Sequence, residues 1–270
     1  MSITEILSYP FVIRAITVGV LVSLCGALLG VNLVLKKLSM LGDGLSHVSF
    51  GAAAIGLALG VAPLKISIPI VIIAAFLLVA LQNSGKLSGD AATAVISSSA
   101  LAIGLIVASL TTGMNTDINN FMFGSILAVT KGDVVICAIV SIAVIVLYFV
   151  FYHKIFACAF DEQYAFSSGV NVKFYNCLTA VLTAVVVVVG MRIMGALLIS
   201  SIITFPAISA MRICKKYRTT VILSCIVGVA TFLLGLCVSF FLDVPSSASI
   251  VVINLFVFII FSVIKKLKTV

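Results

Sequence analysis

Long runs of apolar residues with almost no charge inside them limit the fold of this chain more than any other feature. Apolar residues make up 63% of the 270 residues, and only 9% are charged. A soluble domain of this length normally has roughly a quarter of its residues charged. Too little polar surface is present to cover a globule in water, so we expect the lipid bilayer to be the main solvent.

The apolar runs have the length of membrane spans, since a helix needs about 20 mostly apolar residues to cross the hydrocarbon with its backbone satisfied. Nine spans are predicted, at residues 12–35, 46–62, 66–83, 92–111, 132–152, 174–190, 193–211, 219–242 and 247–264. Several are short or separated only by Pro or Gly, so eight spans fit nearly as well. Residues 117–129 are too short to span and predict an interfacial or re-entrant helix. The fold class is therefore all-α, a polytopic bundle of eight or nine spans in which residues 1–270 form a single transmembrane domain.

The basic residues predict the orientation of this bundle. With nine spans and the N-terminus outside, one side holds Lys36, Lys37, Lys86, Lys154, Lys173, Arg212, Lys215, Lys216, Arg218, Lys265, Lys266 and Lys268, and the other holds Arg14, Lys65, Lys131 and Arg192. Because cytoplasmic loops are rich in Lys and Arg, the first side and the C-terminus are expected in the cytoplasm. The net charge of +8 then reflects topology. No nucleic-acid partner is expected, because neither aromatic interleaving nor a soluble basic domain accompanies the charge.

Ionisable groups are concentrated at one place in the apolar region, the stretch Gly42-Asp43-Gly44-Leu45-Ser46-His47. If the membrane surface lies near Lys36 and Lys37, His47 is roughly 15 Å deeper, at 1.5 Å per helical residue. We expect the two glycines of the stretch to break or bend the helix there, as in substrate sites of transporters. Asp43 and His47 are four residues apart and should share a helix face. A carboxylate and an imidazole so placed are competent ligands for a first-row divalent ion.

The same pair has a purely structural interpretation, in which Asp43 and His47 neutralise each other between helices. The spacing alone favours neither interpretation. The chain has only two histidines, and His153 lies at the end of a predicted span, so a closed site with several histidines cannot be built. Any metal is therefore expected to be held loosely and in passing, as in a pore.

Other chemistries find little support. The seven cysteines form no Cys-x-x-Cys pair, and in apolar runs a free thiol behaves as a small hydrophobe, so neither disulfides nor a zinc cluster are expected. No phosphate-binding loop and no Gly-x-Ser-x-Gly motif occur. An intramembrane aspartyl protease would need two suitably buried aspartates, which are hard to find. We therefore expect a chain that is not an enzyme and binds no permanent cofactor.

The longest polar interruption, Phe160 to Val172, falls on the basic side and contains a pattern F-D-x-x-x-A-x-x-x-G-V. It resembles the coupling segment, here about residues 160–173, of permease subunits in bacterial zinc and manganese ABC importers. The resemblance extends in order along the chain, through Gly42 to His47, Phe123 to Leu127, Gly190 to Ser200, Pro206-Ala207 and Leu242 to Ser246. Phe205 and Ser247 depart slightly from the family pattern, away from the expected metal path.

The resemblance implies a permease like those of type II ABC importers, in the bacterial cytoplasmic membrane. It implies a second copy of the chain, cytoplasmic ATPase subunits on separate polypeptides and an extracellular metal-binding protein. It places Asp43 and His47 in the metal translocation path. The residues expected to couple the chain to the ATPase are Asp161, Glu162, Gly169 and Val170. The expected cargo is zinc, with manganese as the runner-up.

Two other classes of membrane protein remain as alternatives. A secondary metal transporter or channel would need no ATPase, but it usually shows repeated halves or more intramembrane acids, and only Asp43 is clearly deep. A membrane enzyme would need a second catalytic cluster near the first. Because the chain lacks a nucleotide-binding loop, ATP energy must reach it through contact with another protein. Co-purification with an ATPase would separate the first hypothesis from the other two.

Overall fold

The computed structural model describes residues 10–83, 88–111, 124 and 130–269, and these residues form helices joined by short connections. In chain order the helices are α2 (Pro10–Leu35), α3 (Leu41–Ala58), α4 (Pro63–Asn83), α5 (Gly89–Leu110), α7 (Lys131–Val150), α8 (Tyr152–Phe160), α9 (Glu162–Ser167), α10 (Val172–Met194), α11 (Ala196–Ile213), α12 (Tyr217–Leu242) and α13 (Ser246–Thr269). The helix predicted at 117–129 lies outside the described residues, apart from Gly124.

Eight of the described helices have the length and composition of membrane spans, namely α2, α4, α5, α7, α10, α11, α12 and α13. They coincide with eight of the nine predicted spans. The ninth predicted span corresponds to α3, an 18-residue helix that contains Asp43 and His47 and packs against α4 and α5. The predicted all-α bundle of eight or nine spans is therefore confirmed.

The start of α3 differs from the prediction. The helix begins at Leu41 instead of residue 46, and it continues through Gly42 and Gly44 without a break. A Cβ at Gly44 would lie 2.3 Å from the Thr93 side chain, and one at Gly42 would lie 3.0 Å from Ile203. These glycines let neighbouring helices approach closely, and the expectation that they break the helix is wrong.

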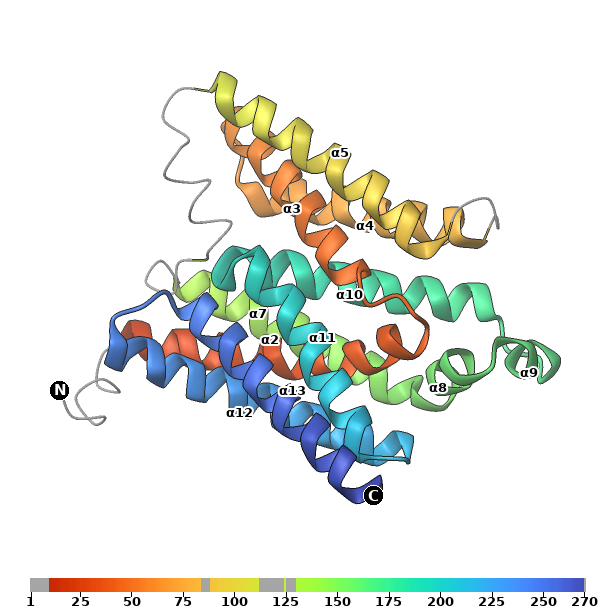
Figure 1. Cartoon of the computed structure of the whole chain (residues 1–270). Coiled ribbons are helices and arrows are strands. Elements are labelled where there is room, and N and C mark those ends of the chain that lie inside the picture. The colour runs from red at the N-terminus through yellow and green to blue at the C-terminus, as the bar shows by residue number, and fades with distance from the viewer. Residues whose placement is uncertain (1–9, 84–87, 112–123, 125–129, 270) are drawn as a thin grey trace.

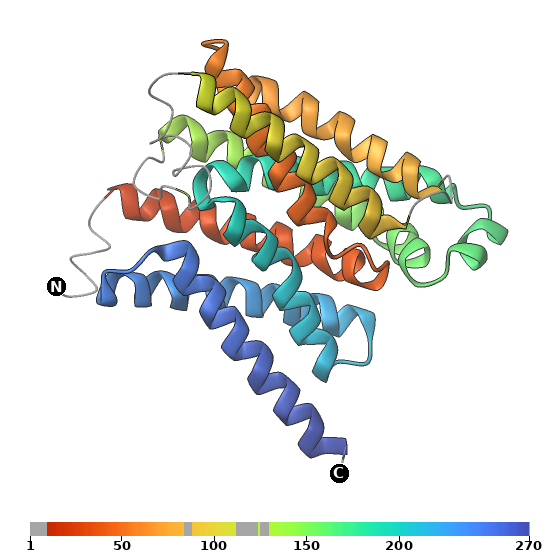
Figure 2. The same ribbon diagram turned by 45° about the horizontal axis from the view of Figure 1, so that its top comes forward.

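The helices form two groups, as Figures 1 and 2 show. In one group α3, α4 and α5 pack together, and in the other α2, α7, α11, α12 and α13 do so. The helix α10 lies between the groups and contacts α3 and α4 as well as α2 and α7. In α2 and in α10, 72% of the residues in the most apolar 18-residue stretch are buried, whereas only 22% of them are buried in α5 and in α13. The bundle is therefore centred on α2 and α10, and α5 and α13 are peripheral.

Close contact at the centre depends on residues without side chains. A Cβ at Gly30 of α2 would lie 1.9 Å from the carbonyl oxygen of Ile203 in α11. A Cβ at Gly51 of α3 would lie 2.4 Å from the carbonyl oxygen of Ala100 in α5. Such contacts supply the van der Waals packing that holds helices together in lipid, where burial of apolar surface gives little driving force.

The two ends of the bundle differ in charge and structure. The turn between α2 and α3, the helices α8 and α9, and the connection between α11 and α12 lie at one end (Figure 1). Lys36, Lys37, Lys173 and Lys215 belong to this end. The start of α2 and the connection between α12 and α13 lie at the opposite end. The basic residues are thus gathered at one end, as the sequence predicts.

A buried cycle of hydrogen bonds connects three helices near the basic end. The Asn32 side-chain amide of α2 donates to the Tyr148 hydroxyl of α7 at 3.3 Å. The Tyr217 hydroxyl of α12 donates to the Asn32 carbonyl oxygen at 2.7 Å and lies 2.9 Å from the Tyr148 hydroxyl. Asn32 is 1% exposed and Tyr148 is 0% exposed. Because polar groups in an apolar interior are unfavourable when unpaired, this cycle fixes the relative positions of the three helices.

Replacing Tyr148 with Phe should therefore destabilise the bundle. The substitution keeps the ring but leaves the Asn32 amide nitrogen without its acceptor, so the free energy of unfolding should fall by about 1 kcal/mol. Thermal unfolding of the purified protein in detergent measures this. Tyr164→Phe is the control, because Tyr164 is 67% exposed and its replacement should leave stability unchanged. Equal stability of Tyr148→Phe and wild type would show that the cycle contributes nothing.

Candidate functional site

Asp43 and His47 lie on the first two turns of α3 and share one face of it. The Nε2 atom of His47 is 3.6 Å from Oδ2 of Asp43, which is within ion-pair range but long for a hydrogen bond. The hydroxyl of Ser46 donates to the Asp43 carbonyl oxygen at 2.7 Å and does not compete for the carboxylate. The two side chains can therefore separate enough to admit an ion between them with a small rotation.

The helix α11 holds the first turn of α3 in place and contributes a third polar group. The Thr204 hydroxyl donates to the Ser39 carbonyl oxygen at 3.5 Å, just before α3 begins. One turn earlier in α11, the side chain of Ser200 forms a hydrogen bond with Asp43. Sequence reasoning did not identify Ser200 as part of this site. Its 157-residue separation from Asp43 leaves no local signal, and only the crossing of α3 and α11 brings the two together.

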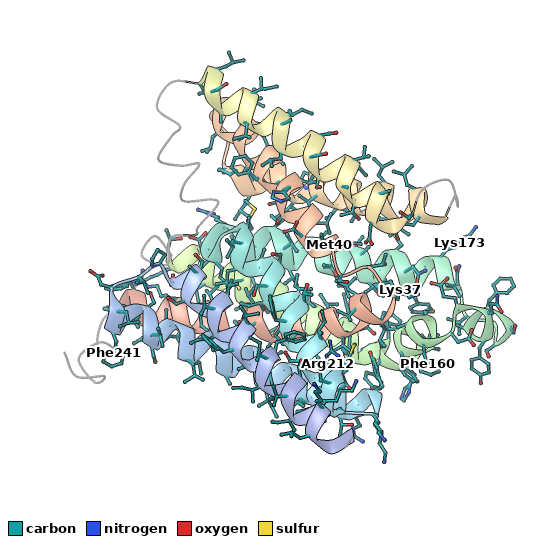
Figure 3. All side chains as sticks on the ribbon, viewed as in Figure 1. Lys37, Met40, Phe160, Lys173, Arg212 and Phe241 are labelled. Atoms are coloured by element: carbon teal, nitrogen blue, oxygen red, sulfur yellow. The ribbon has the colours of Figure 1, made fainter. Side chains whose placement is uncertain are left out.

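The depth of the site follows from the same contacts. Thr204 lies nine residues before Ile213, the last residue of α11, so the two are roughly 14 Å apart along the helix axis. Arg212, near the last residue of α11, marks the basic end there (Figure 3). Ser39, which accepts the hydrogen bond from Thr204 just before α3 begins, is therefore close to half the hydrocarbon thickness from the end of α11, since that thickness is about 30 Å.

The Asp43 and His47 side chains are not enclosed by the bundle. Asp43 is 42% exposed and His47 is 31% exposed. Ionisable groups in contact with lipid at this depth are strongly unfavourable, and in membrane proteins they face protein or water-filled cavities. Among the described residues, no cluster of three or more His, Cys, Asp or Glu side chains is positioned to hold a metal ion. One chain thus presents a carboxylate, an imidazole and a hydroxyl on an open face.

The segment Phe160–Val172 contains the short helix α9, and its sequence pattern has a structural explanation. Asp161 begins the helix, because its Oδ1 accepts hydrogen bonds from the backbone N–H groups of Gln163 at 2.9 Å and Tyr164 at 3.0 Å. Ala165 is fully buried beneath the helix. Asp161 therefore acts first as a helix cap, a role that the spacing D-x-x-x-A alone does not reveal.

Gly169 and Val170 end the same helix. Gly169 has φ +78°, a left-handed conformation that only glycine adopts without steric cost. This turn lets the Val170 N–H donate to the Ala165 carbonyl oxygen at 3.0 Å, and the Gly169 N–H donate to the Phe166 carbonyl oxygen at 3.0 Å. The two bonds form the pattern of a helix that ends at a glycine. A Cβ at Gly169 would have no atom within 4 Å. The requirement for glycine here is therefore conformational and not steric.

The surface of this segment is unusually apolar for a position outside the spans. Phe160, Tyr164 and Phe166 are 76%, 67% and 76% exposed. Beside them lies an open groove of about 890 Å³ whose lining runs from Glu162 through Gly169 to Lys173. Figure 3 shows Phe160 at the end of α8 and Lys173 near the start of α10, the two helices that α9 connects. Exposed apolar surface gathered at one place marks a site of contact with another protein.

Glu162 faces the bundle. Its Oε1 accepts a hydrogen bond from Lys36 at 2.7 Å and another from the Asn176 side-chain amide at 3.0 Å. Lys36 also donates to the Asn176 side-chain oxygen. The three residues come from α9, from the turn after α2 and from α10, so they tie the short helix to the bundle. Glu162 was predicted as a coupling residue, but its partner inside the chain was not.

A second ion pair, at the opposite end of the bundle, was also missed by sequence reasoning. Arg192 of α10 lies 2.8 Å from Asp133 of α7, whose side chain is 8% exposed. The same carboxylate accepts hydrogen bonds from the backbone and hydroxyl of Thr130, which caps α7. This pair fixes the ends of α7 and α10 and neutralises the cation of Arg192.

The chain matches known proteins over nearly its whole length. The ABC 3 transport family matches residues 8–265. The high-affinity zinc uptake system membrane protein ZnuB of Haemophilus influenzae is 28% identical over 252 residues, which cover 93% of this chain and 97% of that protein. The manganese import system permease protein ScaB of Streptococcus gordonii is 27% identical over 252 residues, covering 93% of this chain and 90% of that protein.

A solved structure agrees with these matches. The structure of PsaBC from Streptococcus pneumoniae in complex with Fab superposes with a TM-score of 0.86 at 28% identity, covering 96% of this chain and 93% of that one. The resemblance inferred from the ordered motifs is thereby confirmed. The chain belongs to the ABC 3 transport family of membrane permeases.

Proposed function

We propose that this chain is the membrane-spanning permease of an ATP-driven importer that moves zinc into the cell, with manganese as the second candidate cargo. The observation that carries the proposal is the open face of α3, where Asp43 and His47 present an oxygen and a nitrogen ligand deep in the bundle. Carboxylate and imidazole together suit a first-row divalent ion. Relatives whose names specify zinc and manganese uptake support this cargo class.

The exposure of the two ligands favours a second copy of the chain as partner. A face with Asp43 at 42% and His47 at 31% exposure is unfavourable against lipid, and pairing two such faces would cover it. Two copies would bring two carboxylates and two imidazoles to one central path. Four ligands of this kind can replace the water lost by a dehydrating divalent ion.

The donors also suit transport better than storage. Each chain offers one imidazole and one carboxylate, and the Ser200 hydroxyl adds only a weak neutral ligand. Conduction requires binding that is favourable enough for entry and weak enough for release. A loosely built site of this kind meets both requirements, whereas a closed set of thiolates or histidines would trap the ion.

The exposed aromatic residues of the segment Phe160–Val172 supply the contact for a cytoplasmic ATPase. The rings of Phe160, Tyr164 and Phe166 and the adjoining groove lie at the basic end of the bundle, which we assign to the cytoplasm. An extracellular metal-binding protein would then deliver the ion at the opposite end, near Arg192 and the connection between α12 and α13. A gradient-driven transporter would have no use for this apolar surface outside the membrane.

Removing either metal ligand should abolish transport. Asp43→Ala and His47→Ala should each lower uptake of radioactive zinc by at least about tenfold, because a metal ligand matters at least as much as the outer-shell partners whose loss already weakens binding 10- to 100-fold. Uptake of zinc and of manganese is measured with the assembled complex in proteoliposomes. Faster uptake of zinc than of manganese by the wild-type complex identifies zinc as the cargo, and the reverse identifies manganese.

Matched substitutions elsewhere separate this effect from general damage. His153→Ala and Asp90→Ala replace the same residue types at exposed positions in α8 and α5, and uptake should stay at the wild-type rate. If Asp43→Ala and His47→Ala assemble with the ATPase and transport normally, the two residues are not metal ligands. A purely structural pair would instead give poorly assembled protein, since the remaining partner would lack its counter-charge.

Gly169 should be required for coupling. Gly169→Val forces a β-branched residue into a left-handed conformation that disfavours ordinary residues by roughly 1–2 kcal/mol, so the end of α9 should change shape. We expect the ratio of metal transported to ATP hydrolysed to fall, with the bundle still folded. Gly169→Asn is the control, because asparagine tolerates this conformation. Equal ratios for the Val variant and wild type would exclude a role for the turn.

The orientation can be tested by labelling. In a background without native cysteines, Ser167→Cys in α9 should resist a membrane-impermeant thiol reagent in intact cells, because the basic end is cytoplasmic. Val244→Cys, in the connection between α12 and α13, should react readily. Both should react once the membrane is permeabilised. Labelling of Ser167→Cys in intact cells would reverse the assigned orientation.

A further inference from the structure

Lys36 lies at the junction between the contact surface of α9 and the helix that carries the metal ligands. It follows the last residue of α2, its side chain is only 11% exposed, and its ammonium group lies 2.7 Å from Oε1 of Glu162. Asn176 of α10 bonds to both partners and closes a triangle of hydrogen bonds. A lysine so enclosed at a helix end is a fixed connection and not a solvated surface charge.

The chain between Lys36 and the metal ligands is short and constrained. Lys37 has φ +58°, a left-handed conformation that is uncommon for a residue with a side chain. The Leu38 N–H donates to the carbonyl oxygen of Leu33 at 2.8 Å, and the Leu41 N–H donates to the carbonyl oxygen of Leu38 at 3.0 Å. The turn is therefore bonded to the helices on both sides. A displacement of Lys36 is therefore passed to Leu41, and Asp43 lies two residues further on.

A cavity beside the triangle gives it room to rearrange. The cavity has a volume of about 200 Å³, and its lining includes Lys36, Leu41, Gln82, Glu162 and Asn176. The side-chain nitrogen of Gln82 is buried there and has no hydrogen-bond partner within the described residues. Glu162 uses Oε1 for both of its bonds to Lys36 and Asn176. The cavity therefore holds a buried donor, without a partner in the described part of the chain, on the same lining as Lys36, Glu162 and Asn176.

The charges of the pair are maintained at neutral pH. Partial burial of Glu162 by itself raises the pKa of its carboxyl group, but hydrogen bonds from Lys36 and Asn176 and the charge of Lys36 outweigh that effect. The net result is a pKa below the ordinary value. The Lys36–Glu162 contact therefore stays ionic at cytoplasmic pH and weakens only as pH falls through that lowered pKa.

We propose that Lys36 is the positioning residue through which movement of α9 reaches α3 and opens or closes the Asp43–His47 site. This rests on the proposed function, because it assumes that an ATPase moves α9 and that α3 lines the metal path. When the ATPase shifts α9, Glu162 moves relative to Lys36, and the triangle of hydrogen bonds rearranges into the adjoining cavity. The constrained turn then changes the position of the first turn of α3. Coupling requires such a two-state element between the two sites.

The test compares ATP hydrolysis with metal transport in the complete complex in proteoliposomes, with zinc and manganese as the metals. Lys36→Gln should leave ATP hydrolysis within about twofold of wild type and lower the metal transported per ATP by roughly 3- to 30-fold, the range expected for loss of one coupling contact. Lys36→Arg keeps the charge and can still reach Glu162, so it should retain most of the metal transported per ATP. Lys215→Gln removes an exposed lysine charge at the same end of the bundle and should leave the metal transported per ATP unchanged.

A charge exchange gives the decisive result. Lys36→Glu alone should uncouple transport, and combining it with Glu162→Lys should restore a substantial part of the ratio, because the ionic contact is rebuilt with its polarity reversed. If Lys36 only stabilised the fold, Lys36→Gln would reduce assembly and ATP hydrolysis together with transport. That outcome, or a normal ratio in Lys36→Gln, overturns the inference.

The same assay separates this inference from the proposed function. If Asp43→Ala and His47→Ala lose transport while Lys36→Gln keeps its normal ratio, the metal path stands and Lys36 has no part in coupling. If Asp43→Ala and His47→Ala both transport normally, the proposed metal path itself fails, whatever Lys36→Gln does. Loss of coupling in Lys36→Gln together with loss of transport in the ligand variants supports both.

Discussion

The absence of hydrogen-bonding solvent in the bilayer is the constraint on which this structure depends. In lipid the backbone must satisfy itself, so the described residues form long helices with short connections. The same constraint applies to side chains, because each polar group at depth needs a partner or access to water. The cycle of Asn32, Tyr148 and Tyr217 meets this requirement by pairing its members inside the bundle. Asp43 and His47 meet it only in part, because they remain partly exposed, and that contrast is the reason for proposing them as metal ligands.

The sequence predicted the features that depend on composition along the chain. Hydropathy located the eight described helices that are long and apolar enough to span, as well as α3, and the four-residue spacing placed Asp43 and His47 on one face. The need for glycine at position 169 also followed from local chemistry. The predicted break at Gly42 and Gly44 is wrong, because α3 begins at Leu41 and runs through both glycines. Glycine is unfavourable in an isolated helix, but close packing against Thr93 and Ile203 outweighs that preference.

Contacts between helices could not be predicted, since they depend on how helices cross. Lys36 and Glu162 are separated by 126 residues, and Asn32 and Tyr148 by 116. Neither pair has a local pattern that distinguishes it from other polar residues at helix ends. The contribution of Ser200 to the Asp43 site has the same origin. In a bundle of this kind, the sequence indicates which polar residues are unfavourable in lipid. The fold then shows which hydrogen-bond or ion-pair partners stabilise them there.

The position of the proposed metal ligands on α3 has a mechanical consequence. Asp43 and His47 lie in the first two turns of the helix, next to the turn that Lys36 anchors, and not in its middle. The rest of α3 is held between α4 and α5 by close backbone contacts such as that of Gly51 with Ala100. The turn before α3 is bonded to α2 and to α11, so a displacement of Lys36 reaches the first turn of α3 before the rest of that helix. Placing Asp43 and His47 there lets a small shift of α9 change the position of both side chains in the proposed metal path, while the rest of α3 stays packed.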